Sequence, residues 1–119
     1  MKESILVVDD ERGQAEILKA ILEREGYNVV AEAEDGDEAV LLSEKHKPDI
    51  IFMDYLMKNL DGISATEQIK KKQPDVKVIM LTQEARPSVV SSSMKAGATN
   101  FIIKSKISDQ LLNSLRRFH

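Results

Sequence analysis

Five polar residues along the chain have side chains that together could bind and transfer a phosphoryl group. Asp9 and Asp10 follow one apolar run, Asp54 follows another, and Thr82 and Lys104 come at the ends of two more. Three carboxylates placed together repel one another unless cations compensate. Lys104 offsets one charge, and an oxygen-preferring divalent cation such as Mg²⁺ or Mn²⁺ would offset the rest. The set indicates a carboxylate nucleophile, a metal site, and a hydroxyl and an ammonium group for phosphoryl oxygens.

Each of these residues has a simpler explanation when it is taken alone. Asp10 could cap the first helix, and Asp54 could be a turn residue at the end of a strand. Thr82 is a common type of strand residue, and Lys104 a common type of surface residue. Their joint placement favours the functional interpretation, because the carboxyl ends of parallel strands share one edge of a sheet and ligands bind there.

The elements that must position these side chains are five short apolar runs, each followed by a segment with helical spacing. The runs cover residues 5–8, 29–33, 50–53, 76–81 and 101–103. They are nearly continuous in apolar character, which is typical of parallel strands covered on both faces. Five strand–helix repeats predict a three-layer α/β domain with right-handed crossovers.

Helix boundaries are marked by residues with well-understood end preferences. Gly26 ends a first helix, Asp35-Gly36 opens a second, and Asp61 caps a third that stops before Pro74. Pro87 opens a fourth helix and Gly97 ends it. A last helix has its apolar face built from Leu111, Leu112, Leu115 and Phe118. The run Lys70-Lys71-Lys72 is expected at the solvated end of the third helix.

Composition limits the classes of function that fit. The 119 residues suit one domain spanning 1–119, and the net charge of −3 gives no general attraction to nucleic acid or to an anionic membrane. The chain has no cysteine, which excludes disulfides and thiolate metal sites. No apolar stretch approaches the ~20 residues needed to span a bilayer, and the N-terminus lacks a signal peptide. We expect a cytoplasmic protein.

The motifs as a set resemble the receiver domain of bacterial two-component response regulators. They are Val7-Val8-Asp9-Asp10-Glu11, Ile51-Phe52-Met53-Asp54-Tyr55-Leu56-Met57, Asp61-Gly62, Thr82, Gly97-Ala98 and Phe101-Ile102-Ile103-Lys104. The resemblance covers nearly the whole chain. It implies a flavodoxin-like (βα)₅ sandwich whose parallel strands follow the order 2-1-3-4-5.

The resemblance also implies a role for each matched residue. Asp54 would accept the phosphoryl group, Asp10 would bind Mg²⁺ directly, and Asp9 would contact the ion through water. The backbone carbonyl of Leu56 would be another metal ligand, and Asp54 itself a further one. Thr82 and Lys104 would contact the phosphoryl oxygens.

Further residues would govern switching and lifetime. The resemblance implies that Thr82 moves inward on phosphorylation and that Phe101 changes rotamer, which alters the surface of the fourth helix, fifth strand and fifth helix. Leu56, Gln83 and Glu84 would tune the lifetime of the phosphorylated state, and we expect a change at Glu84 to alter dephosphorylation more than phosphorylation.

The partners implied are a histidine kinase or phosphotransfer protein as donor, and an output domain or downstream protein as target. Dimerisation on phosphorylation is common in the family. The domain would act as a switch rather than turn over an external substrate. The stretch 61–82 is most similar to NarL-like receivers, which precede a helix-turn-helix output domain, but no such domain lies within these residues.

Three positions depart from the family pattern. Lys58 stands where proline is usual, Gln83 where a small residue is usual, and Ser105 where proline is common and often cis. A cis bond before serine would cost about 3–4 kcal/mol, so we expect a trans bond. These departures leave open a degenerate receiver that binds partners without being phosphorylated.

Two other families use related folds. A haloacid-dehalogenase-type phosphatase needs Asp-x-Asp after the first strand, whereas this chain has Asp9-Asp10-Glu11 and no room for a cap. A flavin carrier needs a Ser/Thr/Gly-rich phosphate loop at that place, where acidic residues would repel phosphate unless a metal intervened. Both alternatives fit poorly.

Overall fold

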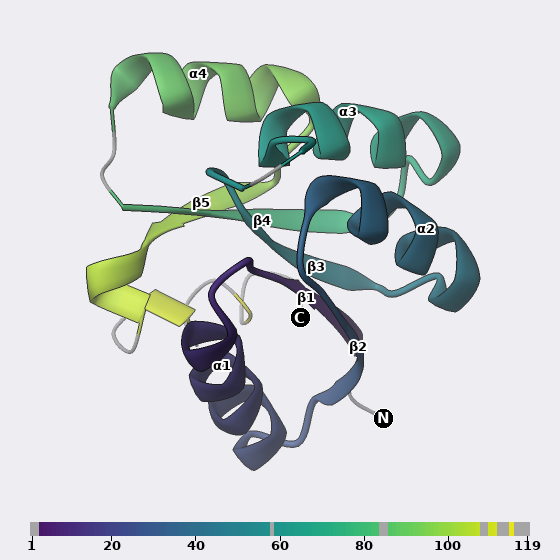
Figure 1. Cartoon of the computed structure of the whole chain (residues 1–119), viewed down its shortest axis with the longest axis vertical. Helices are drawn as coiled ribbons and strands as arrows, with labels where there is room; N and C mark the ends of the chain where they lie inside the picture. Colours follow the sequence, from purple (N-terminus) through teal and green to yellow (C-terminus); the bar gives the residue numbers. More distant parts are fainter. Residues whose placement is uncertain (1–2, 58, 84–85, 108–109, 112–114, 116–119) are drawn as a thin grey trace.

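A five-stranded parallel sheet forms the centre of the protein, with its strands in the order β2-β1-β3-β4-β5 (Figure 1). The computed structural model describes residues 3–57, 59–83, 86–107, 110–111 and 115. The strands are β1 (Ser4–Val8), β2 (Asn28–Ala33), β3 (Ile50–Asp54), β4 (Lys77–Thr82) and β5 (Asn100–Ile103). Each lies within one residue of its predicted limits, and the order confirms the predicted flavodoxin-like fold.

The helices lie in two layers on either side of the sheet, as Figure 1 shows. They are α1 (Arg12–Arg24), α2 (Gly36–His46), α3 (Gly62–Lys72) and α4 (Pro87–Ala96), followed after β5 by a short 3₁₀ helix (Lys104–Lys106). α1 covers one face of the sheet, whereas α2, α3 and α4 cover the other. This arrangement leaves the ends of the strands uncovered, so a site can form there.

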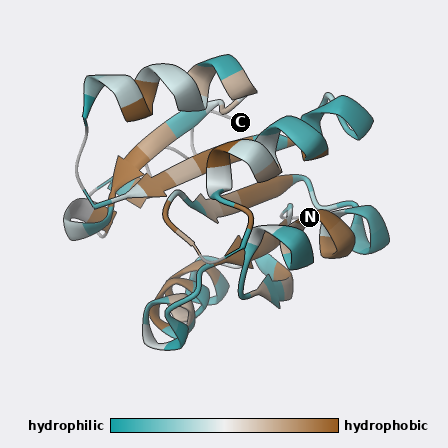
Figure 2. Ribbon diagram, turned by 45° about the horizontal axis from the view of Figure 1, so that its top comes forward, coloured by the Kyte–Doolittle hydropathy of each residue, from teal (hydrophilic) through white to brown (hydrophobic). Residues whose placement is uncertain are grey.

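The apolar strands supply both halves of the core. All five residues of β3 are buried, and Ile51 and Phe52 point to opposite faces of the sheet. The cluster under α1 includes Leu18 and Leu22, and the cluster on the other side includes Ala65 of α3. Figure 2 shows the same distribution, with hydrophobic colour concentrated on the central strands. The near-continuous apolar pattern of the strands follows from this double burial.

Helices α2, α3 and α4 begin at the residues that the sequence predicted, and α4 also ends at its predicted residue. The Oδ1 of Asp35 accepts a hydrogen bond from the N–H of Glu38, and Asp61 caps α3 in the same way. Pro87 occupies the first turn of α4, and Gly97 ends that helix with φ of 112°, a left-handed conformation that glycine adopts without strain. The N-cap of α1 is Glu11 and not Asp10. The simple explanation of Asp10 as a helix cap is therefore wrong, and its carboxylate is available to a ligand.

The last predicted helix falls partly outside the described residues. Ile107, Gln110, Leu111 and Leu115 are helical, and Leu111 and Leu115 are fully buried against the α1 side of the sheet. Leu112 and Phe118 lie outside the described residues. The peptide bond between Lys104 and Ser105 is trans, as expected.

Candidate functional site

The sheet brings the predicted site residues to one edge. Val8 pairs with Met53, and Asp54 pairs with Leu81, so the residues after β1 and at the ends of β3 and β4 are neighbours. Thr82 pairs in turn with Ile103, the residue before Lys104. The register therefore places Asp9, Asp54, Thr82 and Lys104 together, as the sequence predicted.

Three carboxylates meet at this edge. Asp9, Asp10 and Asp54 each offer one oxygen, and these oxygens lie within 4.8 Å of one another. Asp9 and Asp54 are buried, each with 4% of its surface exposed, whereas Asp10 is exposed. The orientation of the Asp9 side chain is fixed by a hydrogen bond, since the Oδ1 of Asp9 accepts from the N–H of Glu11 at 2.8 Å.

One lysine neutralises part of this charge. The Nζ of Lys104 lies 3.2 Å from the Oδ2 of Asp9 and 3.2 Å from the Oδ2 of Asp54. Its side chain is 9% exposed, so these ion pairs are shielded from solvent. The sequence had predicted that Lys104 would offset one charge; in the structure it is shared between two carboxylates.

Burial is the main influence on the Asp54 carboxyl. It raises the pKa of Asp54 to about 7, with the nearby charges of Asp9 and Asp10 acting in the same direction and Lys104 acting against them. A carboxyl group whose pKa is raised close to neutral pH by burial and by neighbouring carboxylates is characteristic of a functional site. A divalent cation would lower this pKa by favouring the ionised form.

The donor set fits a hard divalent cation. Carboxylate oxygens in a cluster of this size, together with a backbone carbonyl and water, are the ligands that Mg²⁺ prefers. The predicted carbonyl donor, Leu56, is an exposed residue on the loop after β3 and lines the same cavity as Asp10 and Asp54. These residues therefore suit the Mg²⁺ site that the sequence indicated.

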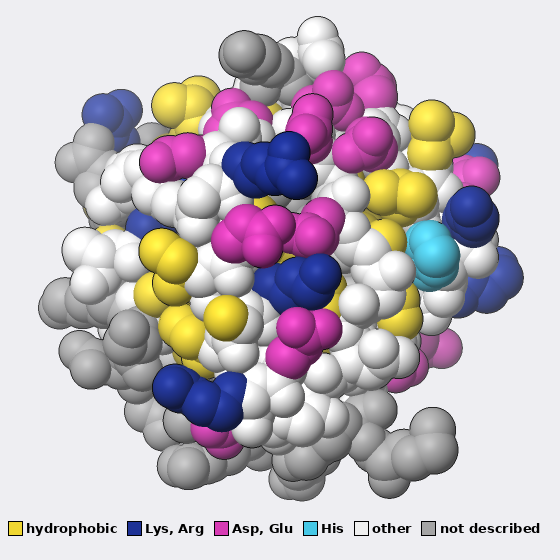
Figure 3. Space-filling view, turned by 60° about the horizontal axis from the view of Figure 1, so that its bottom comes forward, with side chains coloured by type: hydrophobic (Ala, Val, Ile, Leu, Met, Phe, Trp, Pro, Cys, Tyr) yellow, Lys and Arg dark blue, Asp and Glu magenta, His cyan; other side chains and the backbone are white. Residues whose placement is uncertain are grey.

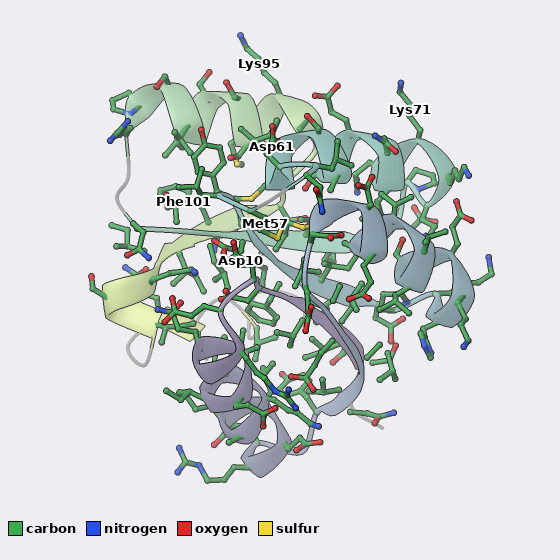
Figure 4. All side chains as sticks on the ribbon, in the orientation of Figure 1. Asp10, Met57, Asp61, Lys71, Lys95 and Phe101 are labelled. Atoms are coloured by element: carbon green, nitrogen blue, oxygen red, sulfur yellow. The ribbon has the colours of Figure 1, made fainter. Side chains whose placement is uncertain are left out.

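A cavity of about 590 Å³ opens over Asp54. The cavity is lined by residues from several strand ends, among them predicted site residues, and by residues at the start of α4. They include Asp10, Leu56, Met57, Thr82, Gln83, Arg86, Val89 and Lys104. Figure 4 shows Asp10 and Met57 at this edge, while Lys71 and Lys95 point away from the body of the protein. The space is sufficient for a small phosphorylated group or a phosphoryl-bearing side chain.

Gly62, which the sequence marked only as part of a motif with Asp61, has a structural role that no local pattern predicted. A Cβ at Gly62 would lie 2.2 Å from the backbone oxygen of Asp54. The N–H of Gly62 also donates to the carbonyl of Tyr55 at 2.9 Å. A residue without a side chain is thus required where α3 starts against the backbone of Asp54.

The predicted switch residues share a face of the sheet. Phe101 pairs with Met80, and both belong to the cluster on the side of the sheet covered by α2, α3 and α4. Thr82 comes two residues after Met80 on β4, so its side chain points to the same side. Phe101 is half-buried and Thr82 is buried. The predicted tuning residue Glu84 and the departure at Lys58 lie outside the described residues.

Charges of both signs are interspersed on the face drawn in Figure 3. Asp and Glu side chains alternate there with Lys and Arg, and the described part of that face carries no broad basic patch. This agrees with the net charge of −3. In the described ranges, no helix combines the length and the apolar character that crossing a membrane requires.

Comparisons with known proteins agree on one family. The sequence model for the "Response regulator receiver domain" matches residues 5–116. Chemotaxis protein CheY of Bacillus subtilis is 37% identical over 117 residues, which are 98% of each chain. The response regulator domain of Thermotoga maritima CheB superposes with a TM-score of 0.90 at 33% identity, covering 98% of this chain and 96% of that one.

A second similar structure was determined with a metal. The receiver domain of sensor histidine kinase PA1611 from Pseudomonas aeruginosa has a TM-score of 0.87 and 30% identity, and covers 98% of this chain and 97% of its own. That structure has a magnesium ion coordinated in its active-site cleft. Similar structures also include a NarL receiver, although chemotaxis proteins match as well, so the NarL-like subgroup stays a prediction.

Proposed function

The chain belongs to the response regulator receiver domain family, and on that premise we propose that it is a switch operated by phosphorylation of Asp54. Receiver domains act in two-component signalling and do not turn over an external substrate. The observation that carries the proposal is the position of the buried Asp54 carboxylate at the base of the cavity, beside Asp10 and Lys104. We propose that a histidine kinase or a phosphotransfer protein donates the phosphoryl group.

The proposed reaction is an in-line displacement at phosphorus. An oxygen of ionised Asp54 forms the new O–P bond while the P–N bond to the donor imidazole breaks, and the imidazole nitrogen keeps the electron pair and is protonated. Mg²⁺ held by Asp9, Asp10 and Asp54 would neutralise negative charge between nucleophile and phosphate. The Lys104 ammonium and the Thr82 hydroxyl would donate hydrogen bonds to the phosphoryl oxygens.

The same residues would transmit the change. A phosphoryl group on Asp54 adds negative charge and acceptor oxygens that attract Thr82 and Lys104. Movement of Thr82 leaves space on the face that it shares with Phe101, and a rotation of Phe101 would fill that space. The surface around α4 and β5 then changes for an output domain, a downstream protein or a second copy of the chain.

Intact-protein mass spectrometry tests the proposal. The protein is incubated with acetyl phosphate and Mg²⁺, beside an Asp54→Asn variant and a sample with EDTA. We expect one phosphoryl adduct in the unaltered protein and none in either control. An adduct that persists in Asp54→Asn would mean that another residue is the acceptor.

A second candidate is a receiver that binds its partner without phosphorylation. The exposed Gln83 side chain, which lines the cavity where the family has a small residue, is the observation in its favour. Absence of an adduct under every condition would support this alternative. A Gln83→Ala variant that then gains an adduct would identify Gln83 as the obstruction.

A further inference from the structure

The N-terminus of α2 is in direct contact with the loop that runs from β3 to α3, residues 55–61. The Nδ2 of Asn59 donates a hydrogen bond to the Oδ2 of Asp35 at 2.8 Å. The Oδ1 of Asp35 accepts from the backbone N–H of Glu38, also at 2.8 Å. One carboxylate thus caps α2 with one oxygen and holds a side chain of the loop with the other.

The backbone around this contact is close-fitting. A Cβ on Gly36 would lie 2.1 Å from the backbone oxygen of Leu60, so the loop rests directly on the first residue of α2. Asn59 has φ of 64°, a left-handed conformation that asparagine tolerates better than most residues. The Asn59–Asp35 bond therefore links the loop to α2 at the place where their backbones lie in contact.

Both ends of the loop are anchored to the backbone near the site. The N–H of Tyr55 donates to the carbonyl of Leu81 at 2.8 Å, and the N–H of Gly62 donates to the carbonyl of Tyr55 at 2.9 Å. Between these anchors the loop carries Leu56 and Met57, which line the cavity over Asp54. The hydrogen bond to Asp35 fixes the middle of this segment.

We propose that Asp35 and Asn59 are positioning residues, whose hydrogen bond holds the β3–α3 loop so that its backbone can ligate a divalent cation. This inference rests on the proposed metal-dependent function. It gives the cap of α2 a role in forming the metal site, although neither residue belongs to the cluster of Asp9, Asp10 and Asp54. The pKa of Asp35 is lowered by the N–H of Glu38 and then by the side chain of Asn59, so the carboxyl is an acceptor at neutral pH.

Two single variants remove the bond in different ways. Asp35→Ser keeps an N-cap oxygen for the N–H of Glu38 but has no second oxygen for Asn59. Asn59→Gly keeps the left-handed backbone accessible and removes the donor. Ser4→Ala is the matched control, because it removes an exposed hydrogen bond to the Asp49 carboxylate on a part of the chain that does not line the cavity.

Calorimetric titration with Mg²⁺ is the first readout. We expect each of the two variants to bind Mg²⁺ about 3- to 10-fold more weakly than the unaltered protein, the effect of one lost hydrogen bond, and Ser4→Ala to bind equally well. The double variant Asp35→Ser/Asn59→Gly should bind no more weakly than the weaker single variant, because both changes remove the same interaction. Additive losses would overturn the inference.

Amide hydrogen exchange in EDTA is the second readout and does not need the metal. The amides of Leu56, Met57 and Leu60 should exchange about 3- to 10-fold faster in both variants, and at the same rate in Ser4→Ala. Unchanged exchange, or faster exchange with unchanged Mg²⁺ affinity, would overturn the inference. Absence of Mg²⁺ binding by the unaltered protein would instead overturn the proposed function, and exchange alone would then decide whether the loop is held by Asp35.

Discussion

The Nζ of Lys104 lies 3.2 Å from the Oδ2 of Asp54, although the strands that lead to these two residues are separated by β4. The lysine side chain must therefore span the end of β4 to reach the carboxylate. It lies at the same distance from Asp9, which follows β1, one strand further away. One ammonium group thus links the ends of three strands, and its side chain lines the cavity over Asp54.

Replacing Lys104 by methionine should lower the unfolding free energy of the metal-free protein and raise its affinity for Mg²⁺. Without the ammonium, Asp9 and Asp54 keep their mutual repulsion, which we expect to cost about 1–3 kcal/mol of unfolding free energy at pH 8. The loss of a competing positive charge should also make Mg²⁺ bind more tightly. Urea unfolding in EDTA and in Mg²⁺ measures both effects. Lys95→Met, at an exposed lysine on α4, is the control and should change neither quantity.

Asp54→Asn should stabilise the metal-free protein at neutral and higher pH. The pKa of Asp54 is about 7 in the folded protein, above the value near 3.8 that an unperturbed carboxyl has. The folded protein therefore binds more protons than the unfolded chain between these values, and its stability falls as pH rises from about 4 to about 7. The full penalty, present above pH 7, is at most about 4 kcal/mol, and we expect a gain of about 1–3 kcal/mol in the amide variant.

Urea denaturation in EDTA at pH 5 and pH 8 tests this expectation. The difference between the two proteins should be larger at pH 8. Adding Mg²⁺ should stabilise the unaltered protein more than Asp54→Asn, because the amide is a poorer ligand for the ion. An equal difference at both pH values would contradict the pKa assigned to Asp54.

Gly62→Ala should destabilise the protein and slow phosphorylation together. The added methyl group would overlap the backbone oxygen of Asp54, which must move, and overpacking of this kind costs about 1–3 kcal/mol. Gly13→Ala is the matched control, since a Cβ there meets nothing within 4 Å and alanine favours the helix by about 0.5–1 kcal/mol. Thermal unfolding and the rate of adduct formation distinguish the two. Unchanged stability of Gly62→Ala would contradict this expectation, because it would mean that the first turn of α3 can move away from the backbone of Asp54 at no cost in free energy.

Thr82→Ala should uncouple Phe101 from the site. Beryllium fluoride with Mg²⁺ mimics a phosphoryl group, and in the unaltered protein we expect the ring resonances of Phe101 to shift on its addition. The variant should show a much smaller shift, because no hydroxyl is drawn toward the ligand and no space is vacated. Thr99→Ala, at an exposed threonine before β5, should behave like the unaltered protein. An equal Phe101 shift in Thr82→Ala would show that the two residues are not coupled.

Local signals were sufficient to predict most of the fold and the convergence at the strand ends. Apolar runs fixed the strands, and residues such as Asp61, Pro87 and Gly97 fixed the helix ends because their effect depends on the adjacent backbone alone. The shared edge followed from the rule that parallel strands present their carboxyl ends together. The position of Asp54, Thr82 and Lys104 at one edge of the sheet could therefore be predicted from the sequence.

Interactions between distant segments could not be predicted in this way. The bond between Asp35 and Asn59 joins residues 24 positions apart, and its existence depends on how α2 rests on the loop. The run Lys70-Lys71-Lys72 ends α3 as predicted, with Lys71 and Lys72 exposed, but Lys70 turns back onto the loop that follows the helix. Its Nζ donates to the carbonyls of Pro74 and Val76 at 2.7 Å, so it is partly buried, and its pKa is lowered first by that burial.

The sequence separation within the site has a consequence for synthesis of the protein. Asp9 and Lys104 are 95 residues apart, and Asp54 comes midway between them. A chain emerging from the ribosome therefore presents its acidic residues long before the ammonium group that balances them. Until β5 has docked against β4, Lys104 cannot reach Asp9 and Asp54, and these carboxylates lack the cation that pairs with them in the folded protein. Neutralisation of the acidic edge by Lys104 therefore depends on completion of the sheet by its last strand.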